Sequence, residues 1–208
     1  MYKRALRGYE KALGAEHSST LSIVNSLGIA YNNQGKLEEA QLMYERALYY
    51  KEKALRVEHL STLNIVNNLG ILYKDQGKLV EAEQIYKQAL CGYEKALGTE
   101  HTSTLLTVNN LGILYNNQGK LIEAEQIYEQ ALHGYKKALG IEHTLMLRTV
   151  NNLGILYQHQ DKLAEAEKML KWTLHGYEKA LGAEHTSMLN MVHNLGDLYN
   201  DQGKFEEA

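Results

Sequence analysis

Residues 108–120 read Val-Asn-Asn-Leu-Gly-Ile-Leu-Tyr-Asn-Asn-Gln-Gly-Lys, and similar stretches recur at 24–36, 66–78, 150–162 and 192–204. Successive stretches begin 42 residues apart. The repetition extends beyond the quoted stretch, because residues 62–103 and 104–145 differ at only ten of 42 positions. A fixed period of this length indicates an array built from one repeated supersecondary unit.

Each unit contains two helical patterns. Apolar residues recur at three- and four-residue steps over 104–117, which predicts a first helix, named helix A. After a break at 118–120 the same period continues over 121–139 and predicts a longer helix B. The chain has no proline and is rich in Leu, Ala, Glu, Lys and Gln, so an all-α fold is expected.

Glycines mark the predicted helix ends. Gly119 and Gly140 suit the left-handed backbone position that commonly ends a helix. Arg56 and Asp161 interrupt these two glycine series. A residue other than glycine costs on the order of 1 kcal/mol there if the backbone stays left-handed, so we expect strain or a changed turn at both corners.

The helix pairs must stack, because one pair cannot cover its own apolar face. We expect a single solenoid over 1–208, with a partial helix B at 1–14 and about five units in all. It is interpreted as a fragment of a longer array. The expected repeats span about 20–61, 62–103, 104–145 and 146–187, with a partial repeat at 188–208.

One repeat carries the spacing of a known family. Leu-Gly and Tyr in helix A, followed by Ala, an aromatic residue and Ala in helix B, resemble the tetratricopeptide repeat at Leu27, Gly28, Tyr31, Ala40, Tyr44 and Ala47. The 42-residue unit is similar to the kinesin light chain class, and the near-identical repeats are similar to the tails of fungal NLR-like proteins. The resemblance implies a right-handed superhelical solenoid whose A helices line a concave, peptide-binding groove.

Helix A carries a two-residue-wide ladder of amides. Each amide offers donors and an acceptor, which suits capture of the backbone of an extended peptide. Alternatively, one asparagine of each pair, either the first or the second, bonds to the neighbouring helix A and holds the stack together, and an asparagine can serve both purposes. The resemblance implies ligand binding, with most weight on Asn67, Asn109 and Asn151. The ladder comprises Asn25, Asn67, Asn68, Asn109, Asn110, Asn151 and Asn152.

Variable positions beside the ladder are expected to set specificity. They include Asn64, Arg148, Lys74 and Asn116. These scattered cations do not form a carboxylate clamp, so a ligand with a chaperone-type acidic C-terminus is disfavoured. Arg148 either pairs with one acidic ligand residue or is an ordinary solvated residue.

Composition excludes several classes of function. The net charge is −3 without a basic cluster, which argues against a nucleic-acid partner. A single cysteine, Cys91, gives no disulfide framework and fits a cytoplasmic protein. Neither a membrane span, which needs roughly 20 apolar residues, nor a cofactor is expected.

Repetition also argues against metal and catalytic sites. Histidines recur every 42 residues, but equivalent residues of stacked repeats lie about 10 Å apart, against zinc–nitrogen bonds of about 2 Å. We therefore expect them to cap helix A. Cys91 is interpreted as a partly buried, unreactive thiol. Trp172 marks either a contact surface or packing against the next repeat.

The sequence thus predicts a protein–protein interaction scaffold that binds an extended peptide or partner protein, and no enzyme. The alternative is a structural or self-associating array that forms the sensor or oligomerisation tail of a larger NLR-like signalling NTPase. Apolar stacking faces at the ends of an array also make end-to-end self-association an open alternative.

Overall fold

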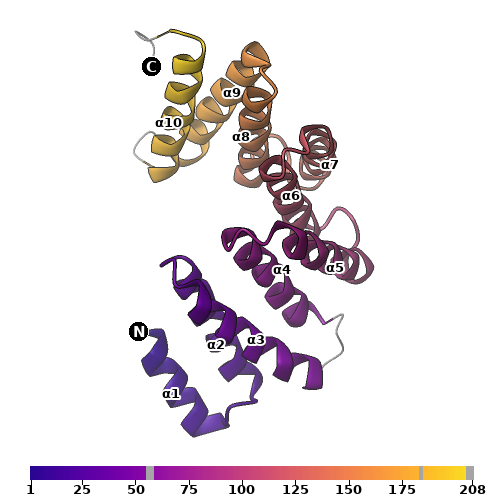
Figure 1. The fold of residues 1–208 in the computed structure, drawn as a ribbon, viewed down its shortest axis with the longest axis vertical. Helices are drawn as coiled ribbons and strands as arrows, with labels where there is room; N and C mark the ends of the chain where they lie inside the picture. Colours follow the sequence, from indigo (N-terminus) through magenta and orange to yellow (C-terminus); the bar gives the residue numbers. More distant parts are fainter. Residues whose placement is uncertain (55–58, 183–184, 205–208) are drawn as a thin grey trace. The chain divides into compact units, whose positions relative to one another are not determined.

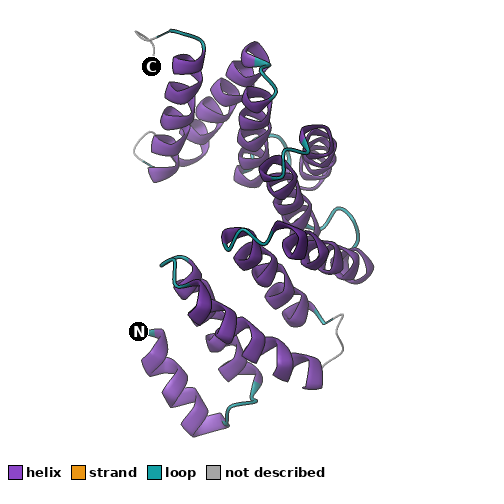
Figure 2. Ribbon diagram, viewed as in Figure 1, coloured by secondary structure: helices purple, strands orange, loops and turns teal. Residues whose placement is uncertain are grey.

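The computed structural model describes residues 1–54, 59–182 and 185–204. The residues described there form ten α-helices and no β-strand. Figure 1 labels these helices, and Figure 2 colours them by secondary structure. The all-α prediction is confirmed. The chain divides into two compact units, unit 1 over Met1–Gly98 and unit 2 over Thr99–Ala208.

Unit 1 contains three B helices separated by two A helices. Helices α1, α3 and α5 are B helices, and α2 and α4 are A helices. Each A helix packs against the B helices before and after it, and the two A helices also touch. The bounds are α1 Tyr2–Leu13, α2 Ser18–Asn32, α3 Leu37–Ala54, α4 Leu60–Asp75 and α5 Leu79–Leu97.

Unit 2 contains three A helices separated by two B helices. Helices α6, α8 and α10 are A helices, and they touch their neighbours of the same kind. The helices predicted over 104–117 and 121–139 correspond to α6 and α7, which confirms both. The bounds are α6 Thr102–Asn117, α7 Leu121–Leu139, α8 Thr144–His159, α9 Leu163–Leu181 and α10 Thr186–Asp201.

The two helices of a repeat approach closely at a glycine of helix A. The ring of Tyr128 on α7 is 1% exposed and lies against Gly112 on α6. A Cβ atom added to Gly112 would stand 2.5 Å from the Cε1 atom of that ring. Tyr44 lies against Gly28 in the same way, with a corresponding distance of 2.6 Å. Glycine is therefore required at this position by packing.

The turns after helix A keep one backbone conformation whether or not glycine is present. Gly119 has a φ of 73° and Asp161 has a φ of 61°, so the expected strain at Asp161 is confirmed. Gly140 does not adopt the left-handed helical conformation predicted for it, so that prediction was wrong. Its φ is 85° but its ψ is 169°, because the chain leaves helix B in an extended direction. Arg56 lies outside the described residues.

Candidate functional site

The asparagine ladder consists of side-chain hydrogen bonds between successive A helices. In unit 1, Asn68 Nδ2 donates to Asn25 Oδ1 at 3.0 Å. In unit 2, Asn152 Nδ2 donates to Asn109 Oδ1 at 3.1 Å. The second asparagine of one repeat thus donates to the first asparagine of the repeat before it. The stack-holding interpretation is confirmed for these pairs.

The first asparagines are more deeply buried in unit 2 than in unit 1. Asn109 and Asn151 are 1% and 6% exposed, whereas Asn25 is half-buried. Asn109 Oδ1 also accepts from Thr149 Oγ1 at 3.1 Å, and Asn151 Oδ1 accepts from Asn194 Nδ2 at 2.9 Å. In unit 2 these amides therefore belong to the helix interface. The first asparagine Asn67 and the second asparagine Asn110 are both half-buried.

Asn64 and Arg148 are exposed and lie close to tyrosines at the end of helix B. Tyr93 Oη donates to Asn64 Oδ1, and burial raises the pKa of Tyr93 to about 12. Burial also raises the pKa values of Tyr135 and Tyr177, while the nearby charge of Arg148 opposes both shifts. The two predicted specificity positions therefore share one structural setting.

Lys74 and Asn116 lie near the C-terminal ends of their A helices and have polar partners. Lys74 forms an ion pair with Asp75 at 2.9 Å. The same Asp75 accepts from Asn32 Nδ2 of the preceding A helix at 2.8 Å. Asn116 Oδ1 lies 2.8 Å from Nδ1 of His159, which is one repeat further on. The Asn32–Asp75 and Asn116–His159 contacts add a second row of links between neighbouring A helices.

Lys51 is a site residue that sequence reasoning missed. It lies near the end of α3, it is 3% exposed, and its Nζ atom donates to Ser18 Oγ at 2.7 Å. Burial lowers the pKa of its ammonium group. The equivalent residues one, two and three repeats later are Tyr93, Tyr135 and Tyr177. This break in a tyrosine series was the available signal.

A polar cavity of about 190 Å³ surrounds this lysine. Two successive A helices, α2 and α4, form most of its wall, and α3 contributes Lys51. Among the residues that the structure describes, the wall contains one cation and no carboxylate. The lining residues are Leu21, Ser22, Asn25, Ser26, Lys51, Ser61, Asn64 and Ile65.

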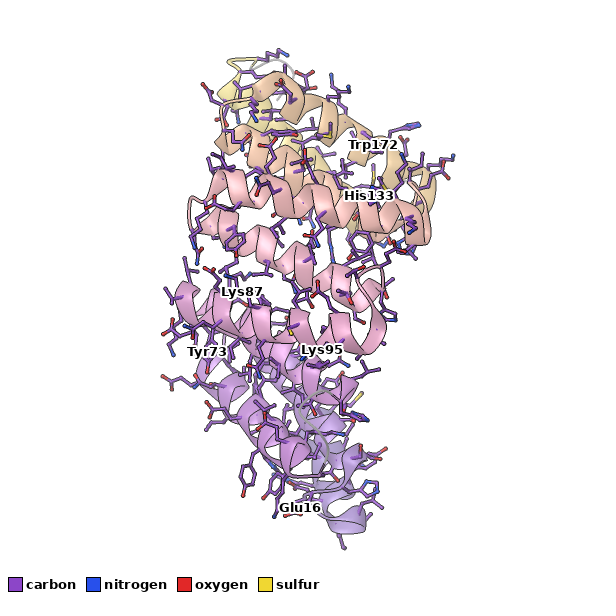
Figure 3. All side chains as sticks on the ribbon, turned by 90° about the vertical axis from the view of Figure 1, so that its right-hand side faces the viewer. Glu16, Tyr73, Lys87, Lys95, His133 and Trp172 are labelled. Carbon is purple, nitrogen blue, oxygen red and sulfur yellow. The ribbon has the colours of Figure 1, made fainter. Side chains whose placement is uncertain are left out.

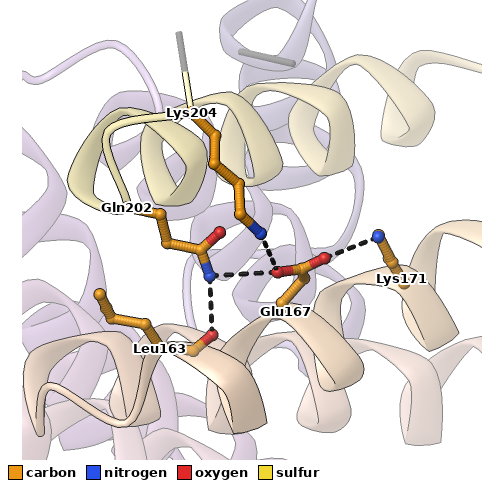
Figure 4. A network of polar contacts seen from close by, with 5 residues as sticks. All are labelled: Leu163, Glu167, Lys171, Gln202 and Lys204. Carbon is orange, nitrogen blue, oxygen red and sulfur yellow. Dashed lines mark hydrogen bonds and ion pairs between the residues drawn. The ribbon is translucent and has the colours of Figure 1, made fainter. Parts of the chain in front are cut away.

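The junctions of unit 2 contain a glutamate held by three donors. Glu167 accepts from Lys171 at 2.7 Å, Lys204 at 3.0 Å and Gln202 at 3.1 Å (Figure 4). Gln202 Nε2 also donates to the Leu163 carbonyl at 3.2 Å. Hydrogen bonds from Lys171, Lys204 and Gln202, in that order, hold the pKa of Glu167 at about 2.

The preceding junction of unit 2 has a similar arrangement with two donors, because Glu129 stands at the place equivalent to Lys171. Glu125 accepts from Gln160 at 2.9 Å and from Lys162 at 3.3 Å, and the Gln160 bond is the main cause of its lowered pKa. In unit 1 the equivalent position on α3 is the neutral Gln41, which accepts from Gln76 Nε2 at 3.0 Å, whereas the one on α5 is Glu83, which forms an ion pair with Lys87 at 2.7 Å. The contacts of Gln76, Gln160 and Lys162 secure the turn after helix A to the preceding helix B.

The repeated histidines cap helix A. In four repeats the imidazole Nδ1 accepts the backbone N–H two residues later, at 3.1–3.2 Å. The capping prediction is confirmed for His17, His59, His101 and His143. Over the described ranges, no group of three or more His, Cys, Asp or Glu residues is placed to hold a metal ion.

Two further residues lie on the B-helix surface. Cys91 is exposed, so the expected partial burial was wrong. It follows the buried Ala89 by two residues and therefore lies about 200° round the helix from it. Trp172 on α9 is 39% exposed, and it is labelled together with His133 of α7 in Figure 3. No helix in the described part of the chain is long and apolar enough to span a membrane.

Comparison with known proteins agrees with this geometry. A family model described as Tetratricopeptide repeat matches residues 1–53, 60–137, 102–179 and 145–208. The solved structure of BtubC (BKLC) from P. vanneervenii superposes with a TM-score of 0.80 at 22% identity, over 100% of this chain and 84% of that one. A putative kinesin light chain from Podosopora anserina, with nearly identical TPR-like repeats, gives 0.73 at 30% identity, over 92% and 90%. A search of curated proteins gave no match.

Proposed function

Because this chain belongs to the tetratricopeptide repeat family, with repeats of the kinesin light chain-like class, we propose that it binds an extended peptide along its A helices. Tetratricopeptide repeats generally serve as protein-interaction scaffolds. In this proposal the chain acts by binding a partner protein, and not by catalysis.

The cavity between α2 and α4 is the observation that carries the proposal. Its wall combines amide, hydroxyl and ammonium groups from two successive A helices with the apolar side chains of Leu21 and Ile65. Ligand sites commonly combine apolar surface with a few polar groups that fix the orientation of the ligand. A partner segment that crosses successive A helices would meet this surface.

The ladder contributes by fixing the spacing of the A helices before a ligand arrives. Its amide oxygens are already engaged between repeats, as at Asn25, Asn109 and Asn151. A surface that is ordered in advance loses less conformational entropy on binding. We therefore assign direct ligand contact chiefly to the exposed Asn64 and Arg148, with Asn67, Asn110, Lys74 and Asn116 flanking them.

A display-library peptide screen tests this function. The parent chain is compared with the double variant Asn64→Ala and Arg148→Ala, and with the matched control Glu165→Ala and Lys168→Ala, which changes exposed residues of helix α9. We expect the screen to enrich peptides that bind the parent chain. The A-helix variant should bind these peptides about tenfold or more weakly. The α9 control should bind like the parent. All three proteins should have the same helical circular dichroism.

Two outcomes would contradict the proposal. Either no peptide enriches, or the A-helix and α9 variants bind the enriched peptides equally well. A self-associating repeat array within a larger protein would then be the better account of the chain.

A further inference from the structure

Lys51 carries a buried charge for which the described residues supply no matching anion. Within the described residues its ammonium has one hydrogen bond, to the neutral hydroxyl of Ser18 at 2.7 Å, and it forms no ion pair. Desolvation is the cause of its lowered pKa. A buried cation of this kind is unfavourable unless a negative charge reaches it. In the described chain no residue of the cavity wall supplies that charge.

The amides in the cavity wall have donors left over. Asn25 Oδ1 accepts from Asn68, and Asn64 Oδ1 accepts from Tyr93. A primary amide has two N–H donors besides its oxygen, and an ammonium has three. With both oxygens engaged, Asn25 and Asn64 offer N–H groups beside Lys51. Three sets of donors therefore converge on one cavity.

The serine hydroxyls add acceptors to the same wall. Ser22 Oγ donates to the Ser18 carbonyl and Ser26 Oγ donates to the Ser22 carbonyl, each at 3.0 Å. Their hydrogens are engaged, so their oxygens remain to accept. A ligand that combines a negative group with nearby N–H donors fits both parts of the wall. An acidic residue within a peptide has this combination.

The other repeats fill the equivalent place. Tyr93 and Tyr177 are 3% and 7% exposed, and their hydroxyls donate to Asn64 Oδ1 and to the Thr144 carbonyl. A phenol there is a neutral group where Lys51 carries a charge. Lys51 therefore makes this place chemically distinct within the array, and such a place would fix the register of a bound chain.

We infer that the cavity around Lys51 binds one carboxylate of the partner peptide, with Lys51 as the cation and Asn25 and Asn64 as neutral donors. The inference rests on the proposed peptide-binding function, and it identifies the place where one group of the peptide is held. One cation matches one negative charge, whereas a phosphate, with a charge of about −1.5 to −2, would call for more. The carboxylate comes from either an acidic side chain or the end of a chain.

An NMR titration with four short peptides tests the site and separates the two sources. The probes are acetyl-Gly-Asp-Gly-amide, acetyl-Gly-Asn-Gly-amide, acetyl-Gly-Gly-Gly with a free carboxylate, and its amide. The signals followed are the side-chain NH₂ groups of Asn25 and Asn64 and the ε-CH₂ of Lys51. We expect saturable shifts with at least one carboxylate peptide and none with the amides. Equal shifts with the Asp and Asn peptides, or no shifts at all, would overturn the inference.

Variants near the end of α3 identify the responsible cation. Lys51→Met keeps the length of the side chain without its charge and should weaken binding by about tenfold or more, as expected for loss of a charge-assisted hydrogen bond. Lys51→Arg should stay within about threefold of the parent. Lys53→Met removes an exposed charge two residues away and should change nothing. Equal losses from the changes at 51 and 53 would point to general charge attraction and contradict the site.

The experiments distinguish failure of the carboxylate site from failure of peptide binding as a whole. If library peptides bind regardless of their carboxylates and of Lys51→Met, the carboxylate site is wrong and peptide binding stands. If the library yields no binder, peptide binding is wrong, while the titration still decides whether the cavity takes a carboxylate.

Discussion

The α2–α4 segment of unit 1 and the α8–α10 segment of unit 2 follow one template, but their differences include three equivalent places with structural consequences. One lies at the end of helix B, one near its beginning, and one in the turn after helix A. The pairs are Lys51 and Tyr177, Gln41 and Glu167, and Gly35 and Asp161. The shared residues build the same helices in both segments. The differing residues therefore show which places are free to specialise.

The end of helix B shows the largest difference between the two segments. Tyr177 is 7% exposed, packs with Leu147 and Met188, and donates to a backbone carbonyl. Lys51 occupies the equivalent place beside a cavity of about 190 Å³. The tyrosine thus contributes to the core, whereas the lysine places a charge at a hollow. The buried charge of Lys51 therefore lowers the stability of unit 1 and makes this place polar.

Exchanging the residue at this place in unit 2 should have the largest effect. Tyr177→Lys should destabilise the protein by about 3 kcal/mol, because it removes a buried ring and places a second cation near Arg148. Tyr177→Phe keeps the ring and should lose only about 1 kcal/mol. Urea denaturation followed by circular dichroism measures both. If the lysine variant were as stable as the phenylalanine variant, the two places would not differ as described.

The reverse change in unit 1 should be stabilising. Lys51→Met replaces a buried cation with an apolar side chain of similar length, and should add about 1 kcal/mol at pH 7. The folded-state pKa of Lys51 is lowered, so its penalty exists while the unfolded chain is protonated and disappears as pH rises toward the ordinary value of 10.5. The gain should therefore shrink between pH 7 and pH 10.5. Thermal melts at both pH values test this, and a gain that grows with pH would contradict it.

The turn after helix A should give a smaller effect. Asp161→Gly should stabilise by about 0.7 kcal/mol, because glycine adopts a φ of 61° without steric strain. A rise in melting temperature of about 2 °C corresponds to this gain. The matched control is Gly119→Asp, which should lower the melting temperature by a similar amount. If Asp161→Gly lowered it instead, the aspartate would have a stabilising contact that outweighs the strain.

The beginning of helix B should give the smallest effect at neutral pH. Glu167→Gln should lower the free energy of unfolding by about 0.5 kcal/mol, because solvent screens partly exposed ion pairs and limits the stability that they contribute. The pKa of Glu167 is lowered to about 2, so its contribution is present above 4.5 and is lost as pH falls toward 2. Parent and variant should converge in stability at pH 2. Glu165→Gln, an exposed neighbour, is the control and should match the parent throughout.

The sequence was sufficient for the helices because they depend on local periodicity. The stripe over 104–117 led to α6, and the histidine spacing led to four helix caps. The ladder was also predictable, but not its hydrogen-bond pattern. Whether Asn109 meets a peptide or Asn152 depends on the distance between two A helices, which composition does not encode.

The cavity at Lys51 was beyond sequence reasoning for a related reason. The break in the tyrosine series was visible, but a lysine near the end of a helix is usually solvated. Its burial arises only when α2, α3 and α4 come together and Ser18 lies 2.7 Å from its Nζ atom. The ψ of Gly140 was similarly unpredictable, since glycine permits several directions for the departing chain.

The ladder also bears on how such an array changes in copy number. Its amides join residues that are 43 positions apart, one more than the 42-residue unit, at each pair that the structure records. If a recombination event inserted or removed whole units that carry the Asn-Asn pair, each new boundary between such units would again place an asparagine donor opposite an asparagine acceptor. The gene is thus able to lengthen or shorten without a new interface having to evolve at the join.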